Sequence, residues 1–158
     1  MRLYFLRHGI AEDREKWQGD DTDRPLTEKG RKRLERTAKN IAPLDLELDA
    51  IITSPLLRAR ETAEIMAKIL KLKDALREDA RLAPGFNLAA LKNLLAEHAE
   101  CKAILLVGHE PDFSQTIHAL THGVVVMKKG ALARVDLDDV NTLEGHLAWL
   151  IPPKVLSN

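Results

Sequence analysis

The sequence predicts a three-layer α/β/α sandwich with a mostly parallel central sheet and an antiparallel edge. Short apolar runs of strand length alternate with longer segments in which apolar residues recur at helical spacing, and this alternation is typical of such a fold. Residues 103–107 are apolar throughout and are flanked by polar residues, as expected for a central strand buried on both faces. The chain has 158 residues, a length that predicts one domain over residues 1–158 with a single core.

The first half of the chain predicts two strands, each followed by a helix. The predicted elements are a strand at 2–7, a polar loop at 10–25, a helix that opens at 26–30 and ends before Pro43, a strand at 50–53 and a helix at about 56–71. Thr27 is the expected N-cap of the first helix, in which Leu34, Ala38 and Ile41 recur at helical spacing. The second helix carries an apolar face of Ala59, Ala63, Met66, Ala67 and Leu70.

The second half predicts the central strand and the edge of the sheet. Its predicted elements are an irregular stretch at 73–87, a helix at about 88–99, the strand at 103–107 and a helix at about 112–121. Three later segments, at 124–126, 131–137 and 146–151, predict edge or antiparallel strands.

The composition argues against several classes of protein. Lys and Arg together number 24, as do Asp and Glu, so the formal net charge is zero and a general nucleic-acid binder is not expected. No segment approaches the roughly 20 apolar residues of a membrane helix, and the first residues lack the apolar core of a secretion signal. With one cysteine, Cys101, no internal disulfide can form. We therefore expect a cytoplasmic protein with no nucleic-acid or membrane partner, in which Cys101 is structural.

Three of the predicted strands end in residues that can do chemistry. Arg7, His8 and Gly9 end the first strand, and Arg58 lies in the first turn of the helix after the second strand. His109 follows the central strand. In open α/β sheets, ligands bind outside the carboxyl ends of the strands. We therefore expect two arginines and two histidines to converge on one edge of the sheet.

Two arginines and two histidines suit a phosphoryl group. Arginine presents a planar fork of donors to phosphate oxygens, and histidine can attack phosphorus to form a phosphohistidine that water then hydrolyses. The attacking ring nitrogen must be unprotonated, and a hydrogen bond from the other ring nitrogen, for example to a backbone carbonyl, would hold that tautomer. The second histidine can donate to a phosphoryl oxygen. This arrangement needs no metal or cofactor, and Gly9 would let a ligand approach the backbone closely.

These motifs resemble the histidine phosphatase superfamily. The matching residues follow the family order over nearly the whole chain: Arg7-His8-Gly9, Leu26-Thr27-Glu28-Lys29-Gly30, Ser54-Pro55-Leu56 with Arg58-Ala59 and Thr62-Ala63, and Gly108-His109. The resemblance implies a phosphoglycerate mutase-like fold with His8 as the phosphorylated nucleophile. It also implies Arg7, Arg58 and His109 as the rest of the phosphate pocket. The minimal length and the segments 24–27, 108–111 and 147–153 are most similar to the short SixA-type phosphohistidine phosphatases.

Residues 81–86 depart from the superfamily pattern. Esterases and mutases of this superfamily usually carry a glutamate proton donor here, and this stretch contains no carboxylate. An alkoxide leaves poorly without a general acid, worth roughly 10²–10⁴-fold, whereas a phosphohistidine releases imidazole, which can take a proton from solvent before cleavage. Glu110 is the nearest other candidate acid, or else a carboxylate favoured at a helix N-terminus. Arg24 is a candidate ligand for the phosphate or its carrier, or else a solvated loop charge.

The sequence therefore predicts a metal-independent phosphatase that works through a phosphohistidine intermediate on His8. Its expected substrate is phosphohistidine on another protein, such as a phosphotransfer domain or a sugar-transport phosphocarrier. Phosphate or similar anions are expected in the pocket. Two alternatives remain open at this point: a small-molecule phosphomonoesterase or mutase of the same superfamily, and a non-catalytic phosphate-binding module.

Overall fold

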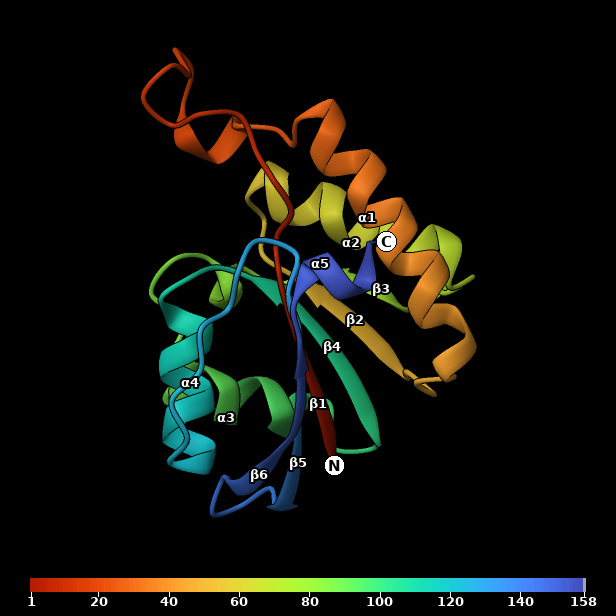
Figure 1. The fold of residues 1–158 in the computed structure, drawn as a ribbon. Coiled ribbons are helices and arrows are strands. Elements are labelled where there is room, and N and C mark those ends of the chain that lie inside the picture. The colour runs from red at the N-terminus through yellow and green to blue at the C-terminus, as the bar shows by residue number, and fades with distance from the viewer. Residues whose placement is uncertain (158) are drawn as a thin grey trace.

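The computed structural model describes residues 1–157 and contains a mixed six-stranded sheet with helices on both faces (Figure 1). The strands are β1 (Arg2–Arg7), β2 (Ala50–Thr53), β3 (Leu76–Glu78), β4 (Ala103–Gly108), β5 (Leu132–Asp139) and β6 (Glu144–Ile151). The helices are α1 (Glu28–Ile41), α2 (Leu57–Ile69), α3 (Leu88–Glu97), α4 (Asp112–Thr121) and α5 (Pro153–Leu156). Helices α1, α2 and α5 cover one face of the sheet, and α3 and α4 cover the other (Figure 1). The predicted three-layer sandwich is confirmed.

The order of the strands is β3-β2-β4-β1-β5-β6. The pairs β3–β2, β2–β4 and β4–β1 are parallel, and the pairs β1–β5 and β5–β6 are antiparallel. This confirms a mostly parallel sheet with an antiparallel edge. Every residue of β4 is buried, because β4 lies inside the sheet and helices cover both of its faces.

Two apolar clusters lie on opposite faces of the sheet. Alternate residues of β1 point to opposite faces, so Leu3 and Phe5 pack in the cluster that includes α3 and α4, whereas Tyr4 and Leu6 pack in the cluster that includes α1 and α2. All four side chains are buried. The apolar run of β1 therefore joins both halves of the core and holds the end of the strand in place.

Helix α1 begins as the sequence predicts. The hydroxyl of Thr27, the N-cap, accepts a hydrogen bond from the backbone N–H of Gly30 at 2.9 Å. Leu34, Ala38 and Ile41 are all buried. Helix α1 has 14 residues, and within residues 1–157 no helix combines the length and the apolar character needed to cross a membrane.

Two sequence predictions of strand position are wrong. The stretch 73–87, expected to be irregular, contains the short edge strand β3, which pairs in parallel with β2. Residues 124–126, expected to be a strand, form none, and Val124 and Val126 are 88% and 72% exposed. A strand needs a partner with free backbone groups, and β3 has one whereas residues 124–126 have none. Side-chain pattern alone therefore misplaces both segments.

Candidate active site

The carboxyl ends of three adjacent parallel strands bring the predicted residues together. Strand β4 lies between β1 and β2, so the residues that follow these strands gather at one edge of the sheet. The rings of His8 and His109 have centroids 5.3 Å apart and planes tilted by 54°. Both histidines line a cavity of about 760 Å³, together with Arg7 and Arg58.

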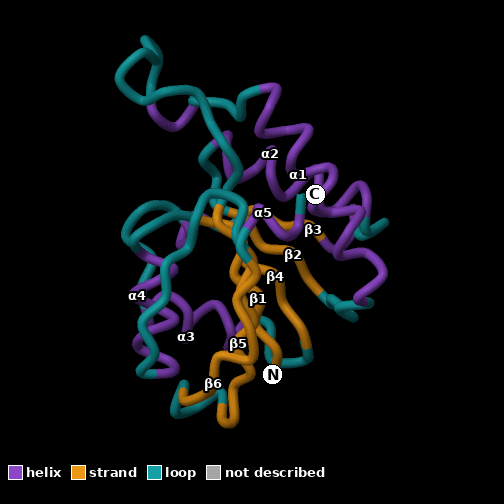
Figure 2. The backbone as a smooth tube through the Cα atoms, viewed as in Figure 1, coloured by secondary structure: helices purple, strands orange, loops and turns teal. Residues whose placement is uncertain are grey.

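One wall of this cavity comes from the polar loop between β1 and α1. This loop extends past the carboxyl edge of the sheet (Figure 2). Its residues in the cavity wall are Ala11, Glu12, Asp13, Arg14, Lys16, Asp21 and Arg24. The loop predicted from its polar composition is therefore part of the candidate site.

His8 is held in a single neutral form. Its Nδ1 lies 2.8 Å from the carbonyl oxygen of Gly9, and because a carbonyl only accepts hydrogen bonds, Nδ1 carries the proton and Nε2 keeps its lone pair. The pKa of His8 is lowered to about 3, mainly by burial, which outweighs the opposing hydrogen bond to Gly9; the charges of His109, Arg58 and Arg7 act in the same direction as burial. At neutral pH the imidazole is uncharged, as a nucleophile must be.

Gly9 has a packing role that the sequence did not predict. A Cβ built on Gly9 would lie 2.5 Å from Cδ1 of Leu34, so the close approach that requires glycine is to α1. Its backbone N–H donates to the hydroxyl of Thr62 at 3.1 Å, and that hydroxyl donates to the carbonyl of Arg58 at 2.7 Å. Gly9 is absent from the residues that line the cavity. It ties the end of β1 to α1 and α2.

The two arginines are held at the cavity by backbone carbonyls. Arg7 donates from one terminal nitrogen to the carbonyl of Met127 at 2.8 Å. Arg58 donates to the carbonyl of Asp21 at 2.8 Å and to its carboxylate at 3.1 Å. Burial lowers the pKa of both guanidinium groups, partly offset by Glu110 for Arg7 and by Asp21 for Arg58. Arginine nevertheless stays charged in proteins, so both supply fixed positive charge.

His109 is oriented by Ser54. The Nε2 atom of His109 lies 2.8 Å from the hydroxyl oxygen of Ser54, and that oxygen accepts a hydrogen bond from the backbone N–H of Leu56 at 3.3 Å. The pKa of His109 is lowered to about 4, mainly by burial and then by the charge of Arg58, against the opposing charge of Asp21. The serine thus both caps the turn before α2 and holds the second histidine.

Unpaired polar atoms gather around this cavity. Within residues 1–157, four buried side-chain nitrogen or oxygen atoms lack a hydrogen-bond partner. Three of the four belong to the predicted site: Nε of Arg7, Nε of Arg58 and Nδ1 of His109. Such atoms are rare because leaving them unpaired costs about 1–3 kcal/mol each. A bound anion would offer acceptors to the Nε–H groups of the two arginines, and to Nδ1 of His109 once that nitrogen carries a proton.

Arg24 is not a solvated loop charge. It is 8% exposed, lines the cavity and donates to the carbonyl of Glu12 at 2.7 Å. Its Nε also donates at 2.9 Å to the carboxylate of Asp21, the same carboxylate that pairs with Arg58. Sequence reasoning missed Asp21. Its carboxylate bridges two arginines from the cavity wall, and these contacts lower its pKa against the effect of partial burial.

Glu110 lines the cavity but its carboxylate is engaged elsewhere. It accepts from the backbone N–H of Ser114 at 3.1 Å and from the hydroxyl of Ser114. This is the arrangement of a carboxylate at a helix N-terminus, since Glu110 lies just before α4. The stretch 81–86 contains no carboxylate, and of its residues only Pro84 lines the cavity, so this stretch contributes no acid to the site.

Comparison with known proteins places these residues in a family context. The model of the histidine phosphatase superfamily (branch 1) matches residues 3–83. An uncharacterized protein of Picosynechococcus sp. is 40% identical over 96% of this chain and 100% of its own length. Phosphohistidine phosphatase SixA of Escherichia coli is 26% identical over 97% of this chain and 94% of its own length.

A solved structure has a similar fold. The protein histidine phosphatase SixA complexed with tungstate superposes with a TM-score of 0.87 over 99% of both chains, at 24% sequence identity. The segment matched by the family model is half of the chain and holds Arg7, His8 and Arg58. The chain therefore belongs to branch 1 of the histidine phosphatase superfamily and is a phosphatase.

Proposed function

We propose that this protein is a metal-independent phosphatase that transfers a phosphoryl group to His8 and then to water, with phosphohistidine on a signalling or phosphocarrier protein as substrate. The observation that carries the proposal is the cavity itself. A neutral histidine with a free Nε2 lone pair lies beside buried Nε–H donors of Arg7 and Arg58 that lack partners, and beside the unpaired Nδ1 of His109. A nucleophile beside an anion site is the arrangement that phosphoryl transfer requires.

In the first step, Nε2 of His8 attacks phosphorus and forms the new P–N bond as the bond to the leaving group breaks. The guanidinium groups of Arg7 and Arg58 stabilise the negative charge on the phosphoryl oxygens. In the second step, water attacks the phosphohistidine, inorganic phosphate leaves, and His8 regains its lone pair. The hydrogen bond to Gly9 holds the same His8 tautomer throughout.

Phosphate binding would change the contacts of Arg58 and the pKa of His109. The carboxylate of Asp21 occupies a donor of Arg58 in the free enzyme, and phosphoryl oxygens would replace it. The arriving negative charge would also raise the pKa of His109 from its low value, because an opposite charge favours the protonated form. The protonated ring of His109 would then donate a hydrogen bond to a phosphoryl oxygen in the transition state and keep its proton.

The choice of substrate rests on the leaving group. The stretch 81–86 contains no carboxylate, Glu110 is engaged with Ser114, and Asp21 pairs with Arg24 and Arg58. Without a glutamate at the position where the esterases of the superfamily carry their proton donor, imidazole leaves more readily than an alkoxide, because it can be protonated by solvent. The similarity to a phosphohistidine phosphatase over nearly the whole chain supports the same substrate class.

Turnover of a phosphohistidine peptide, compared with a panel of phosphate esters, tests the proposal. We expect faster turnover of the peptide, and faster turnover of esters would contradict the substrate. His8→Ala should lower turnover by on the order of 10⁴-fold or more and abolish the alkali-stable phosphoenzyme. His118→Ala, at an exposed histidine of α4, is the matched control. Unchanged activity in His8→Ala would rule out His8 as the nucleophile.

A further inference from the structure

One side of the molecule gathers basic side chains that have no acidic partner. They come from α1, from the segment before β5 and from α5. The six residues are Lys29, Arg33, Arg36, Lys128, Lys129 and Lys154. Within residues 1–157 none of the six forms an ion pair with a carboxylate. We refer to these six residues as the basic face.

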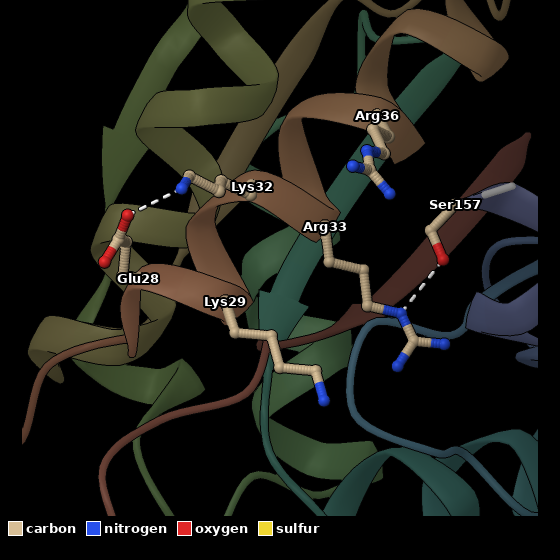
Figure 3. Close-up of a pocket in the computed structure, with 6 residues that line it drawn as sticks. All are labelled: Glu28, Lys29, Lys32, Arg33, Arg36 and Ser157. Carbon is tan, nitrogen blue, oxygen red and sulfur yellow. Dashed lines mark hydrogen bonds and ion pairs between the residues drawn. The ribbon is translucent and has the colours of Figure 1, made fainter.

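Three of these cations surround a cavity of about 440 Å³ beside α1 (Figure 3). Figure 3 shows the side chains of Lys29, Arg33 and Arg36 along the same side of the helix. Lys32 in the same wall is neutralised by Glu28 at 2.6 Å. Arg33 is half-buried and donates from Nε to the hydroxyl of Ser157 at 3.0 Å. The basic charge at this cavity is therefore partly held in place by the C-terminal segment.

A second cavity connects this region with the active site. It has a volume of about 730 Å³, and its basic lining residues include Arg33, Lys128 and Lys154. It shares Arg33 with the first cavity, and it shares Arg7 and Lys129 with the cavity of His8. The basic face thus runs without interruption from α1 to the wall of the active site.

We propose that the basic face docks an acidic surface of the phosphorylated protein substrate while its phosphohistidine enters the active-site cavity. This proposal rests on the proposed function. Continuity with the cavity of His8 favours a protein substrate, because a macromolecule that places a side chain there must also cover the adjoining surface. Val155, 62% exposed, and Pro152 lie in the connecting cavity. They add the apolar contacts that protein interfaces combine with a polar rim.

Charge complementarity at the basic face would mainly raise the rate at which the enzyme and its protein substrate associate. A surface of one sign beside a site raises association rates by about 10–10³-fold at low salt. Small substrates diffuse directly into the cavity and would gain little from residues of α1 and α5. The basic face should therefore discriminate between acidic and neutral carriers of the same phosphohistidine.

The test uses two phosphohistidine peptides, one with glutamate-rich flanks and one with glutamine at the same positions. The docking variant combines Lys29→Glu, Arg36→Glu and Lys154→Glu, all exposed and outside the active-site cavity. The control variant makes the same change of charge on other surfaces, with Lys68→Glu, Lys73→Glu and Lys92→Glu. Both variants are compared with the wild-type protein at low and high ionic strength, and circular dichroism verifies that they fold.

The wild-type protein and the control variant should turn over the glutamate peptide with a kcat/KM about tenfold above that of the glutamine peptide at low salt. The docking variant should lose this preference while its turnover of phosphoimidazole matches that of the control variant. If the docking variant and the control variant prefer the glutamate peptide over the glutamine peptide equally, the docking surface is wrong. It is also wrong if the basic face binds phosphatidylserine vesicles and not the glutamate peptide.

A different result would contradict the proposed function without contradicting the docking surface. If wild-type protein hydrolyses neither peptide, the phosphohistidine substrate is wrong. Binding of the unphosphorylated glutamate peptide, measured by fluorescence anisotropy, still tests the surface. Weaker binding by the docking variant than by the control variant supports the basic face, and equal binding contradicts it.

Discussion

His8 and His109 are ionisable groups that the fold keeps neutral. Burial takes both imidazoles out of water, and the nearby guanidinium groups of Arg7 and Arg58 disfavour a further positive charge. The pKa of His8 falls to about 3 and that of His109 to about 4. This keeps the lone pair of His8 available, and it also makes the stability of the protein depend on pH.

Stability should fall as the pH drops below about 6.5, the ordinary pKa of histidine. Between that pH and the lowered pKa values, the unfolded chain binds protons at His8 and His109 and the folded protein does not. The free energy of unfolding should then decrease by up to about 1.4 kcal/mol per pH unit for each histidine. Urea unfolding between about pH 7 and about pH 5 measures this slope.

The double variant His8→Gln with His109→Gln should flatten that slope. His118→Gln removes an exposed histidine and serves as the control. A double variant that keeps the wild-type slope over this range would show that other groups, and not these two histidines, carry the pH dependence.

Local sequence identified the site histidines and arginines but not the carboxylate between them. Arg7 and His8 lie at the end of one recognisable strand and His109 follows another, so topology alone predicts that they meet. Asp21 lies in a stretch with acidic residues at 20, 21 and 23, which are equivalent in sequence. Only the path of the folded loop selects Asp21 to bridge Arg24 and Arg58.

At the scale of the element, the start of α1 combines a local signal with a tertiary contact. The N-cap at Thr27 is local and was predicted. The contact is not local: Thr27 donates from its backbone N–H to the carbonyl of Ile10 at 2.9 Å, and a Cβ on Gly30 would lie 2.1 Å from that carbonyl oxygen. The first turn of α1 therefore packs directly on the backbone that leaves His8 and Gly9.

Gly30→Ala should destabilise the protein by about 1–3 kcal/mol, because the added methyl group meets backbone that cannot rotate away. The added methyl group should also push away the backbone segment that follows His8, and this shift of the nucleophile should lower kcat. Urea unfolding and phosphatase assays measure the two effects. Lys39→Ala, at an exposed position of the same helix outside the basic face, is the control for helix propensity. Wild-type stability in Gly30→Ala would mean that α1 can shift away from Ile10 at little cost.

At the scale of the whole molecule, one sheet joins two apolar clusters. Strands β1 and β4 contribute side chains to both clusters, so neither cluster keeps its packing when the other is lost. We infer that residues 1–158 unfold as one cooperative unit, as expected for a chain of this length.

The rings of Tyr4 and Trp149 lie 5.8 Å apart on the α1 and α2 face, so the fluorescence of Trp149 reports on one cluster. Far-UV circular dichroism reports on helices of both faces. In a Trp17→Phe background, the two signals should give the same urea midpoint. Two separated midpoints would mean that the faces unfold independently.

The sequence by itself determined the order and type of most elements, the cap of α1 and the four residues that meet at the sheet edge. These features follow from local periodicity, and from the rule that parallel strands end on the same side. Tertiary structure alone decided that residues 76–78 form a strand and residues 124–126 do not, because pairing depends on a neighbour distant in sequence. It also decided that Asp21 faces Arg58, that Gly9 packs against Leu34, and that cations from separate segments form one basic face.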